Sequence, residues 1–251
     1  MAKIRVYSNN ESLIGGASDL IIESAAKAIA ERGRFTLALS GGDTPRPVYA
    51  RLATAGCRHR IDWSKVLIFF GDERCVPPED HQSNYLMVRT ALLDHVPIPP
   101  GNIYRIRGEE APEKAAADYT DILKRTFGGE RVIEGLPPEG FDLILLGMGD
   151  NGHTASLFPG LAAVTETRRW VMALYVEVVG MWRITMTPVI INAARQVAFL
   201  VSGAKKAEML QQVLEGPYQP VVLPSQIITP MSGELHWLLD QSAAAKLRRE
   251  S

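Results

Sequence analysis

The sequence is poor in residues that build metal sites and disulfide frameworks. Among its 251 residues are two cysteines and five histidines. Cys57 and Cys75 are too few for a disulfide framework and lack the spacing of a zinc site. The histidines contain no His-Glu-x-x-His pattern, which excludes the common zinc-hydrolase arrangement. We therefore expect a protein of a reducing compartment, the cytoplasm, with no metal and no cofactor.

An excess of charge of one sign is also absent. Lysine and arginine total 27 and aspartate and glutamate 28, so the formal net charge is -1. This balance gives no field that would attract nucleic acid or an anionic membrane. No apolar run approaches the ~20 residues of a membrane span, and Met1–Tyr7 has none long enough for a signal peptide. We expect neither nucleic acid nor membrane as a partner, so affinity for an anion must come from a few basic groups gathered in one place.

Repeats, low-complexity tracts and long linkers are missing as well. A hydrophobic content of 46% is enough for a full core. The proline- and glycine-rich segment 134–140 is predicted to be a loop and not a boundary. We expect one domain over residues 1–251.

Short apolar runs alternate with longer amphipathic stretches along the chain. The runs predicted to be strands are residues 35–39, 66–70, 141–146, 170–176, 197–201 and 235–239. The stretches predicted to be helices are residues 11–32, 45–54, 111–127, 188–194, 204–214 and 241–250. This alternation predicts an α/β fold with a mostly parallel sheet between helical layers.

Ligands of open parallel sheets bind at the carboxyl ends of the strands, so the segment after each strand is informative. Ser40, Gly41 and Gly42 follow the strand at 35–39. Glycines let a backbone approach an anion closely, and the next helix begins near Pro45 with unpaired N–H groups. A phosphate cradle and a plain tight turn explain this segment equally well.

Three charged residues follow the strand at 66–70, in the segment Gly71–Arg74. Arg74 can pair bidentately with a phosphate or carboxylate, and Asp72 can orient a sugar hydroxyl or a histidine. The alternative is a solvated salt-bridge cluster. The position at a strand end favours a functional role.

The segment that follows the strand at 141–146 contains the strongest candidate, His153. Its glycines match the dinucleotide-binding fingerprint formally, but Pro159 and Gly160 follow too soon for the long helix which that site needs. The glycines instead allow a sharp turn that presents His153, whose imidazole suits a general base activating water. The alternative, a structural histidine bonded to backbone, is the less favoured one because of this position.

Two further cations lie near predicted strands or helix starts. Arg183 precedes Pro188, and a lysine pair follows the strand at 197–201. A lysine at a helix start adds a point charge to the N–H groups there, although Lys205 itself reads as an ordinary surface lysine. A serine hydrolase is disfavoured because no Gly-x-Ser-x-Gly elbow is present.

Taken together and in order, these segments cover nearly the whole chain and resemble the 6-phosphogluconolactonase family, within the superfamily of sugar-phosphate isomerases and glucosamine-6-phosphate deaminases. The matching segments are 40–42, 71–74, 152–159, 183–187, 192–194, 203–207 and 237–240. The resemblance implies a three-layer Rossmann-like fold and hydrolysis of 6-phosphoglucono-δ-lactone to 6-phosphogluconate in the pentose phosphate pathway. It leaves a monomer or a weak homodimer as the expected state.

The resemblance also implies roles for individual residues. His153 would be the base that activates water, and Asp72 the catalytic carboxylate nearby. The residues implied to surround the phosphate and the sugar acid are Ser40, Gly41, Gly42, Arg74, Arg183 and Lys206. In two places the chain departs from the family pattern: Asn151 stands where aspartate is usual, and 180–182 replaces a proline-rich stretch. An asparagine can orient the loop but cannot stabilise an imidazolium by charge.

Two other functions compete with lactone hydrolysis. Glucosamine-6-phosphate deaminases and related isomerases carry a glutamate five residues after the histidine, where this chain has Phe158. An apolar ring cannot move protons, so this alternative is disfavoured. A non-catalytic protein that binds sugar phosphates is the second alternative; regulators of that kind generally add a DNA-binding region, for which the chain has no room.

Overall fold

The computed structural model describes residues 2–128 and 139–248, and its centre is a six-stranded parallel sheet. The strand order is β1-β9-β8-β5-β2-β3, and every pairing within it is parallel. The strands are β1 (Lys3–Tyr7), β2 (Phe35–Leu39), β3 (Val66–Phe70), β5 (Leu143–Gly147), β8 (Gln196–Val201) and β9 (Glu234–Asp240). The predicted α/β class with a mostly parallel sheet is confirmed.

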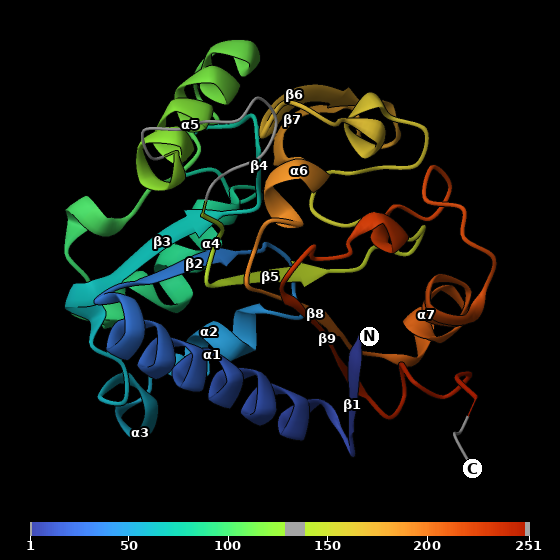
Figure 1. Cartoon of the computed structure of the whole chain (residues 1–251), viewed down its shortest axis with the longest axis horizontal. Helices are drawn as coiled ribbons and strands as arrows, with labels where there is room; N and C mark the ends of the chain where they lie inside the picture. Colours follow the sequence, from blue (N-terminus) through green and yellow to red (C-terminus); the bar gives the residue numbers. More distant parts are fainter. Residues whose placement is uncertain (1, 129–138, 249–251) are drawn as a thin grey trace.

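Helices cover both faces of this sheet. They are α1 (Asn10–Arg32), α2 (Arg46–Leu52), α3 (Ala55–Arg58), α4 (Asn84–Ala91), α5 (Pro112–Phe127), α6 (Pro188–Ile191) and α7 (Ala207–Glu215). α1 and α2 lie on one side of the sheet and α5 and α6 on the other, which gives three layers (Figure 1). The Asn9 side chain caps the start of α1, and Gly33 ends it at a φ of 72°.

The core lies between these layers and explains the apolar runs of the sequence. All five residues of β2 are buried, because helices cover both of its faces. Phe127 of α5 meets Phe141, just before β5, with ring centroids 4.5 Å apart. Phe69 of β3 packs edge-on against Phe141 at 5.2 Å. These aromatic contacts fix α5 against the sheet.

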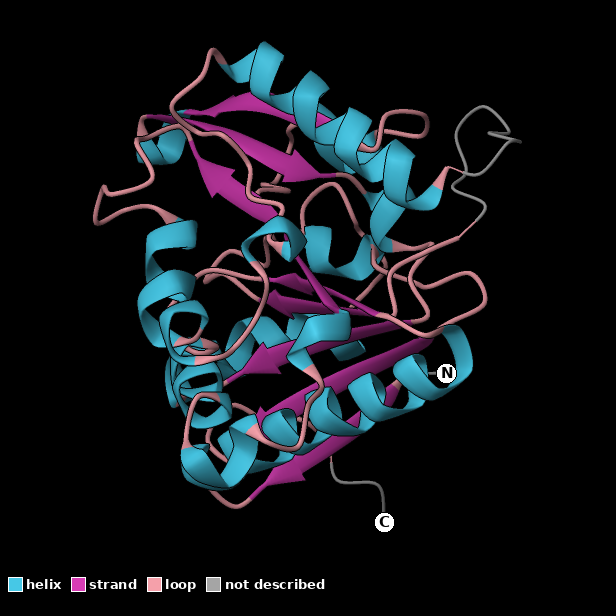
Figure 2. Cartoon of the chain, turned by 90° about the vertical axis from the view of Figure 1, so that its left-hand side faces the viewer, coloured by secondary structure: helices cyan, strands magenta, loops and turns pink. Residues whose placement is uncertain are grey.

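A second, antiparallel sheet lies beside the first. It consists of β4 (Asp72–Arg74), β7 (Met181–Met186) and β6 (Val171–Val176), in the order β4-β7-β6. Figure 2 shows it as a separate group of three strands next to a long helix. Gly71 is the single residue between β3 and β4. Its N–H donates to the carbonyl of Leu39 in β2 at 2.9 Å, and its carbonyl accepts the N–H of Met186 in β7 at 2.8 Å. Gly71 therefore joins the two sheets.

Several expectations about single elements need correction. The segment at 72–74, expected to be a charged connection, is strand β4, and β1, β7, α3 and α4 were not foreseen. The helix expected at 241–250 is wrong for its described part, where residues 241–246 form turns. There the Asp240 carboxylate accepts hydrogen bonds from Ser242 and Ala243, and from Gly203 across the chain. These bonds hold a turn in place of a first helical turn. The expected loop at 134–140 lies largely outside the described residues.

Within residues 2–128 and 139–248, no helix is both long and apolar enough to cross a membrane.

Candidate active site

The carboxyl ends of four adjacent strands bring the predicted site segments to one edge of the sheet. β5 lies between β2 and β8. On one side of β5 the strands follow outward in the order β2, β3, and on the other side in the order β8, β9. Such a reversal of strand order is where open α/β sheets bind ligands. The segments that follow β2, β3, β5 and β8 are 40–42, 71–74, 148–160 and 202–206.

The loop after β5 holds the ring of His153 between two surfaces. The Gly149 N–H donates to the carbonyl of His153 at 2.8 Å, and Gly152 adopts a φ of 76°, which closes the loop tightly. A Cβ atom at Gly149 would lie 2.0 Å from Cε1 and Nδ1 of His153, so the ring occupies the space of a side chain. Phe158 stacks on the ring at 4.0 Å and 18°. The imidazole is thus fixed by the Gly149 backbone and the Phe158 ring.

The Asn151 side chain fixes the tautomer of His153. Its Oδ1 lies 2.6 Å from Nδ1 of His153 and also accepts the backbone N–H of His153 at 3.3 Å. Because a backbone N–H can only donate, the atom it meets is the amide oxygen, and Nδ1 must carry the hydrogen. Nε2 is then the nitrogen with a lone pair, as a base requires.

Burial and nearby positive charges keep the imidazole of His153 neutral. Burial lowers its pKa to about 4; Asp72 opposes this, whereas the positive charges of Lys206 and Arg183 add to it. A neutral imidazole at neutral pH can accept a proton from water.

Asp72 is a buried carboxylate with donors on both of its oxygens. Oδ2 accepts the Ser156 hydroxyl at 2.6 Å and lies 4.0 Å from Nη1 of Arg183. Oδ1 accepts the amide of Asn84 at 3.3 Å. Its influence on His153 is through charge, since the hydrogen-bond partner of that ring is Asn151.

Arg74 and Arg183 are opposite each other in the paired strands β4 and β7. The Nε atoms of both are buried and have no hydrogen-bond partner among the residues that the structure describes. Burial lowers the pKa of Arg183, and the charge of Arg74 adds to this. Two like charges at one cross-strand position are unfavourable by themselves, and an anion that binds both guanidinium groups offsets this cost.

The turn after β2 presents a buried hydroxyl beside a glycine with a positive φ. The Tyr49 hydroxyl bonds both the N–H and the carbonyl of Ser40, at 3.1 and 2.9 Å. The Ser40 Oγ is buried without a partner in the described part of the chain. Gly42 has a φ of 101°, which a side chain would strain. These features favour a ligand-binding turn over a plain connection.

Lys206 follows β8 in the chain, and its ammonium group lies at the loop after β5, residues 148–160, which we call the histidine loop. It lies immediately before α7, at the end of a 3-10 turn, and its Nζ pairs with Asp150. Lys205 is exposed, in agreement with its interpretation as a surface lysine. Asn84, which holds Asp72, was not foreseen, because no charge or motif distinguishes it in the sequence.

The described part of the chain also lacks a set of metal ligands. Within residues 2–128 and 139–248, no group of three or more His, Cys, Asp and Glu side chains could hold a metal ion.

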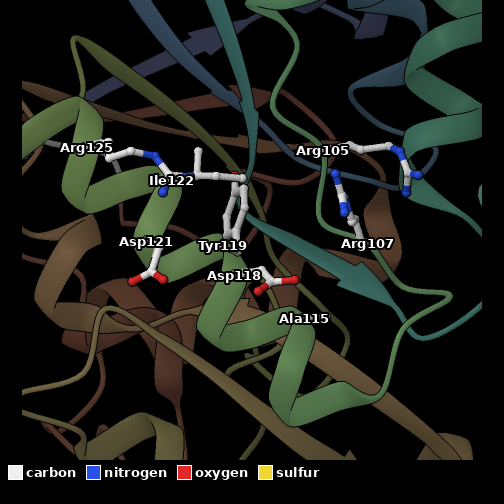
Figure 3. Close-up of a pocket in the computed structure, with 8 residues that line it drawn as sticks. All are labelled: Arg105, Arg107, Ala115, Asp118, Tyr119, Asp121, Ile122 and Arg125. Atoms are coloured by element: carbon white, nitrogen blue, oxygen red, sulfur yellow. The ribbon is translucent and has the colours of Figure 1, made fainter.

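A pocket elsewhere on the surface does not include any of these residues. It has a volume of about 260 Å³ and lies along α5 (Figure 3). Its lining residues are Arg105, Arg107, Ala115, Asp118, Tyr119, Asp121, Ile122 and Arg125. Arg105 is already paired with Glu109 at 2.6 Å, and Asp118 with Lys114 at 3.1 Å. Charges of both signs line this pocket, and it is separate from the strand-end site.

Comparison with known proteins gives a consistent result. The family model described as glucosamine-6-phosphate isomerases/6-phosphogluconolactonase matches residues 8–237. A 6-phosphogluconolactonase of Synechocystis sp. is 43% identical over 247 residues, which cover 98% of this chain and 98% of that protein. One of Nostoc sp. is 41% identical, with 97% and 98% covered.

Solved structures agree with the sequence comparisons. A 6-phosphogluconolactonase from Trypanosoma cruzi superposes with a TM-score of 0.86 at 30% identity, covering 99% of this chain and 98% of that one. A monomeric glucosamine-6-phosphate deaminase superposes with a TM-score of 0.79 at 21% identity, covering 97% and 99%, and shares the fold.

Proposed function

The chain belongs to the glucosamine-6-phosphate isomerase/6-phosphogluconolactonase family, and from this premise we propose that it hydrolyses 6-phosphoglucono-δ-lactone to 6-phosphogluconate in the pentose phosphate pathway. One observation carries the choice within the family. His153 is held as a neutral imidazole with Nε2 available, at an edge where Arg74, Arg183 and Lys206 gather. A water-activating base beside an anion-binding cluster suits a phosphorylated lactone.

In the proposed reaction, Nε2 of His153 removes a proton from water as its oxygen adds to the lactone carbonyl carbon. The tetrahedral intermediate collapses with cleavage of the bond to the ring oxygen. The imidazolium returns its proton to that oxygen, and the new carboxylic acid ionises in solution. General-base help of this kind contributes about 10²–10⁴-fold.

The positive groups serve two tasks in this proposal. The turn at 40–42 with Arg74, Arg183 and Lys206 binds the phosphate and the sugar acid, and a cation among them stabilises the oxyanion. The arginine Nε atoms and the Ser40 hydroxyl, which lack partners among the described residues, support this, because a buried polar group without a partner is costly unless a ligand satisfies it. Phosphate binding also positions the ring for attack.

Asp72 has a supporting role in the proposal. Its negative charge opposes the lowering of the His153 pKa, so it stabilises the imidazolium that forms during attack. The bonds from Ser156 and Asn84 hold it in place for this role.

The presence of Phe158 next to His153 argues against the deaminase alternative. The ring lies flat on His153 and is 7% exposed, so no carboxylate stands beside the base at that position. The non-catalytic alternative makes a different prediction, namely binding of the phosphosugar without turnover.

The decisive experiment measures opening of the δ-lactone by the purified protein against the spontaneous rate. We expect a clear acceleration, with His153→Ala removing about 10²–10⁴-fold of it. His81→Ala, which changes a side chain that is 87% exposed, is the matched control and should leave the rate unchanged. An inactive wild type would favour the non-catalytic alternative, and an unimpaired His153→Ala would refute the role of the base.

A further inference from the structure

The start of α4 is held against the site by a buried carboxylate. Glu73 is 2% exposed and accepts the backbone N–H groups of Asn84 and Tyr85 at 2.7 and 2.8 Å. The Ser83 hydroxyl donates to the same carboxylate at 3.1 Å. Because Glu73 follows Asp72 in β4, these bonds fix the position of Asn84 relative to Asp72.

The side chain of Asn84 then holds Asp72 directly. Asn84 is 2% exposed, and its Nδ2 donates to the Asp72 backbone carbonyl at 2.9 Å and to Oδ1 at 3.3 Å. The other carboxylate oxygen is held by Ser156, from the histidine loop. The plane of the Asp72 carboxylate is therefore set from two sides.

The same amide also sets the position of the turn after β2. A Cβ atom at Gly41 would lie 1.8 Å from Oδ1 of Asn84 and 2.4 Å from its Cγ. The amide thus fills the space of a Gly41 side chain, and Gly41 is required by this contact, since its φ is not positive. Asn84 touches both segments that follow the neighbouring strands β2 and β3.

We propose that Asn84 is a positioning residue of the active site, which keeps the Asp72 carboxylate and the turn at 40–42 in their relative positions. This inference rests on the proposed function for its catalytic readout. A displacement of about 1 Å in a catalytic constellation can cost about a hundredfold in rate. Loss of the amide removes both contacts at once.

Two substitutions separate this role from simple packing. Asn84→Ala removes the amide, and we expect kcat/KM to fall about ten- to hundredfold. Asn84→Asp keeps the shape but replaces the donor by an oxygen that faces the Asp72 carboxylate, so the loss should be at least as large. Thr90→Ala is the control: it changes an exposed hydroxyl of the same helix that bonds the Leu86 carbonyl within α4, and its kcat/KM should stay close to that of the wild type. Wild-type activity in Asn84→Asp would overturn the proposal.

A double-mutant cycle tests whether Asn84 acts through Asp72. In the Asp72→Asn background, Asn84→Ala should cost less than it does in the wild type, because one of its two contacts, that with the carboxylate, is already gone. Equal costs in the two backgrounds would show that Asn84 does not act through Asp72 and would contradict the proposal.

A binding readout keeps the proposal testable without turnover. Inorganic phosphate should raise the Tm of the wild type, and Asn84→Ala should reduce this rise because the turn at Gly41 is displaced. If the wild type lacks lactonase activity but the phosphate effect depends on Asn84, the proposed function fails and the positioning role stands. If phosphate protects Asn84→Ala as well as the wild type, the role at the turn is refuted.

Discussion

The side-chain oxygen of Asn151 lies 2.6 Å from Nδ1 of His153, and it is a neutral acceptor. It fixes the orientation and the tautomer of the imidazole but adds no charge to balance an imidazolium. The pKa of about 4 follows mainly from burial, and the carboxylates of Asp72 and Asp150 oppose this lowering. A charged acceptor at position 151 would add to that opposition, which the neutral amide of Asn151 does not.

Asn151→Asp should raise the pKa of His153, because a carboxylate at the same place stabilises the charged ring. A raised pKa means that the ring becomes protonated, and stops acting as a base, at a higher pH. The acid limb of kcat/KM should move to higher pH than in the wild type. The substrate phosphate ionises identically in both measurements, so the difference reports the enzyme. Superimposable profiles would contradict this account of the pair.

Gly149→Ala should abolish most activity while leaving the fold intact. The added Cβ would meet Cε1 and Nδ1 of His153 at 2.0 Å and displace the ring from its place against the loop. Gly147→Ala is the control in the same segment, since a Cβ there meets nothing within 4 Å. Lactonase assays on both variants measure the loss of activity, and circular dichroism checks that both are folded. Equal activities of the two variants would show that the position of the His153 ring is unimportant.

Lys206→Ala should raise KM more than it lowers kcat. Phosphate binding is largely shared by the ground and transition states, so its loss weakens substrate binding in both. Lys205→Ala, one residue earlier and exposed, should leave both constants unchanged. Steady-state kinetics of the two variants provide the comparison, and a loss confined to kcat would place Lys206 in the chemical step.

Inorganic phosphate should stabilise the wild type against heat. At a concentration a hundred times its Kd, a ligand that binds only the folded state adds about 2.7 kcal/mol. Arg183→Ala should remove most of the increase in Tm, because the Nε of Arg183 is buried without a partner in the described chain. Arg46→Ala, with a side chain that is 61% exposed, should keep it. Full protection of Arg183→Ala would exclude this residue from the anion site.

The sequence predicted the buried strands of the large sheet well, whereas β1 of the same sheet, which is mostly exposed, was missed. Residues 35–39 and 66–70 coincide with β2 and β3, since continuous burial leaves a continuous apolar run. β4 was missed for the opposite reason: it consists of three charged residues whose burial depends on partners from elsewhere in the chain. Asp72, for example, is held by Ser156, 84 positions away.

The members of the candidate site were predictable where an ionisable side chain directly follows a predicted strand. His153, Asp72, Arg74 and Lys206 all follow strands of the parallel sheet, and the parallel arrangement alone brings such segments to one edge. Arg183 reaches the same place through the antiparallel pairing of β7 with β4, which apolar periodicity does not reveal. Asn84 acts through a hydrogen bond and a contact with Gly41, neither of which leaves a pattern in the sequence.

The two sheets that Gly71 joins each contribute residues to the candidate site. The histidine loop and the turn at 40–42 belong to the large sheet, whereas Arg74 and Arg183 belong to the small one. A phosphosugar that touches all of them would link the two sheets through the ligand. Its binding should slow amide hydrogen exchange in β4 and β7 more than in β8 and β9, because β4 and β7 carry the two arginines that the ligand would hold.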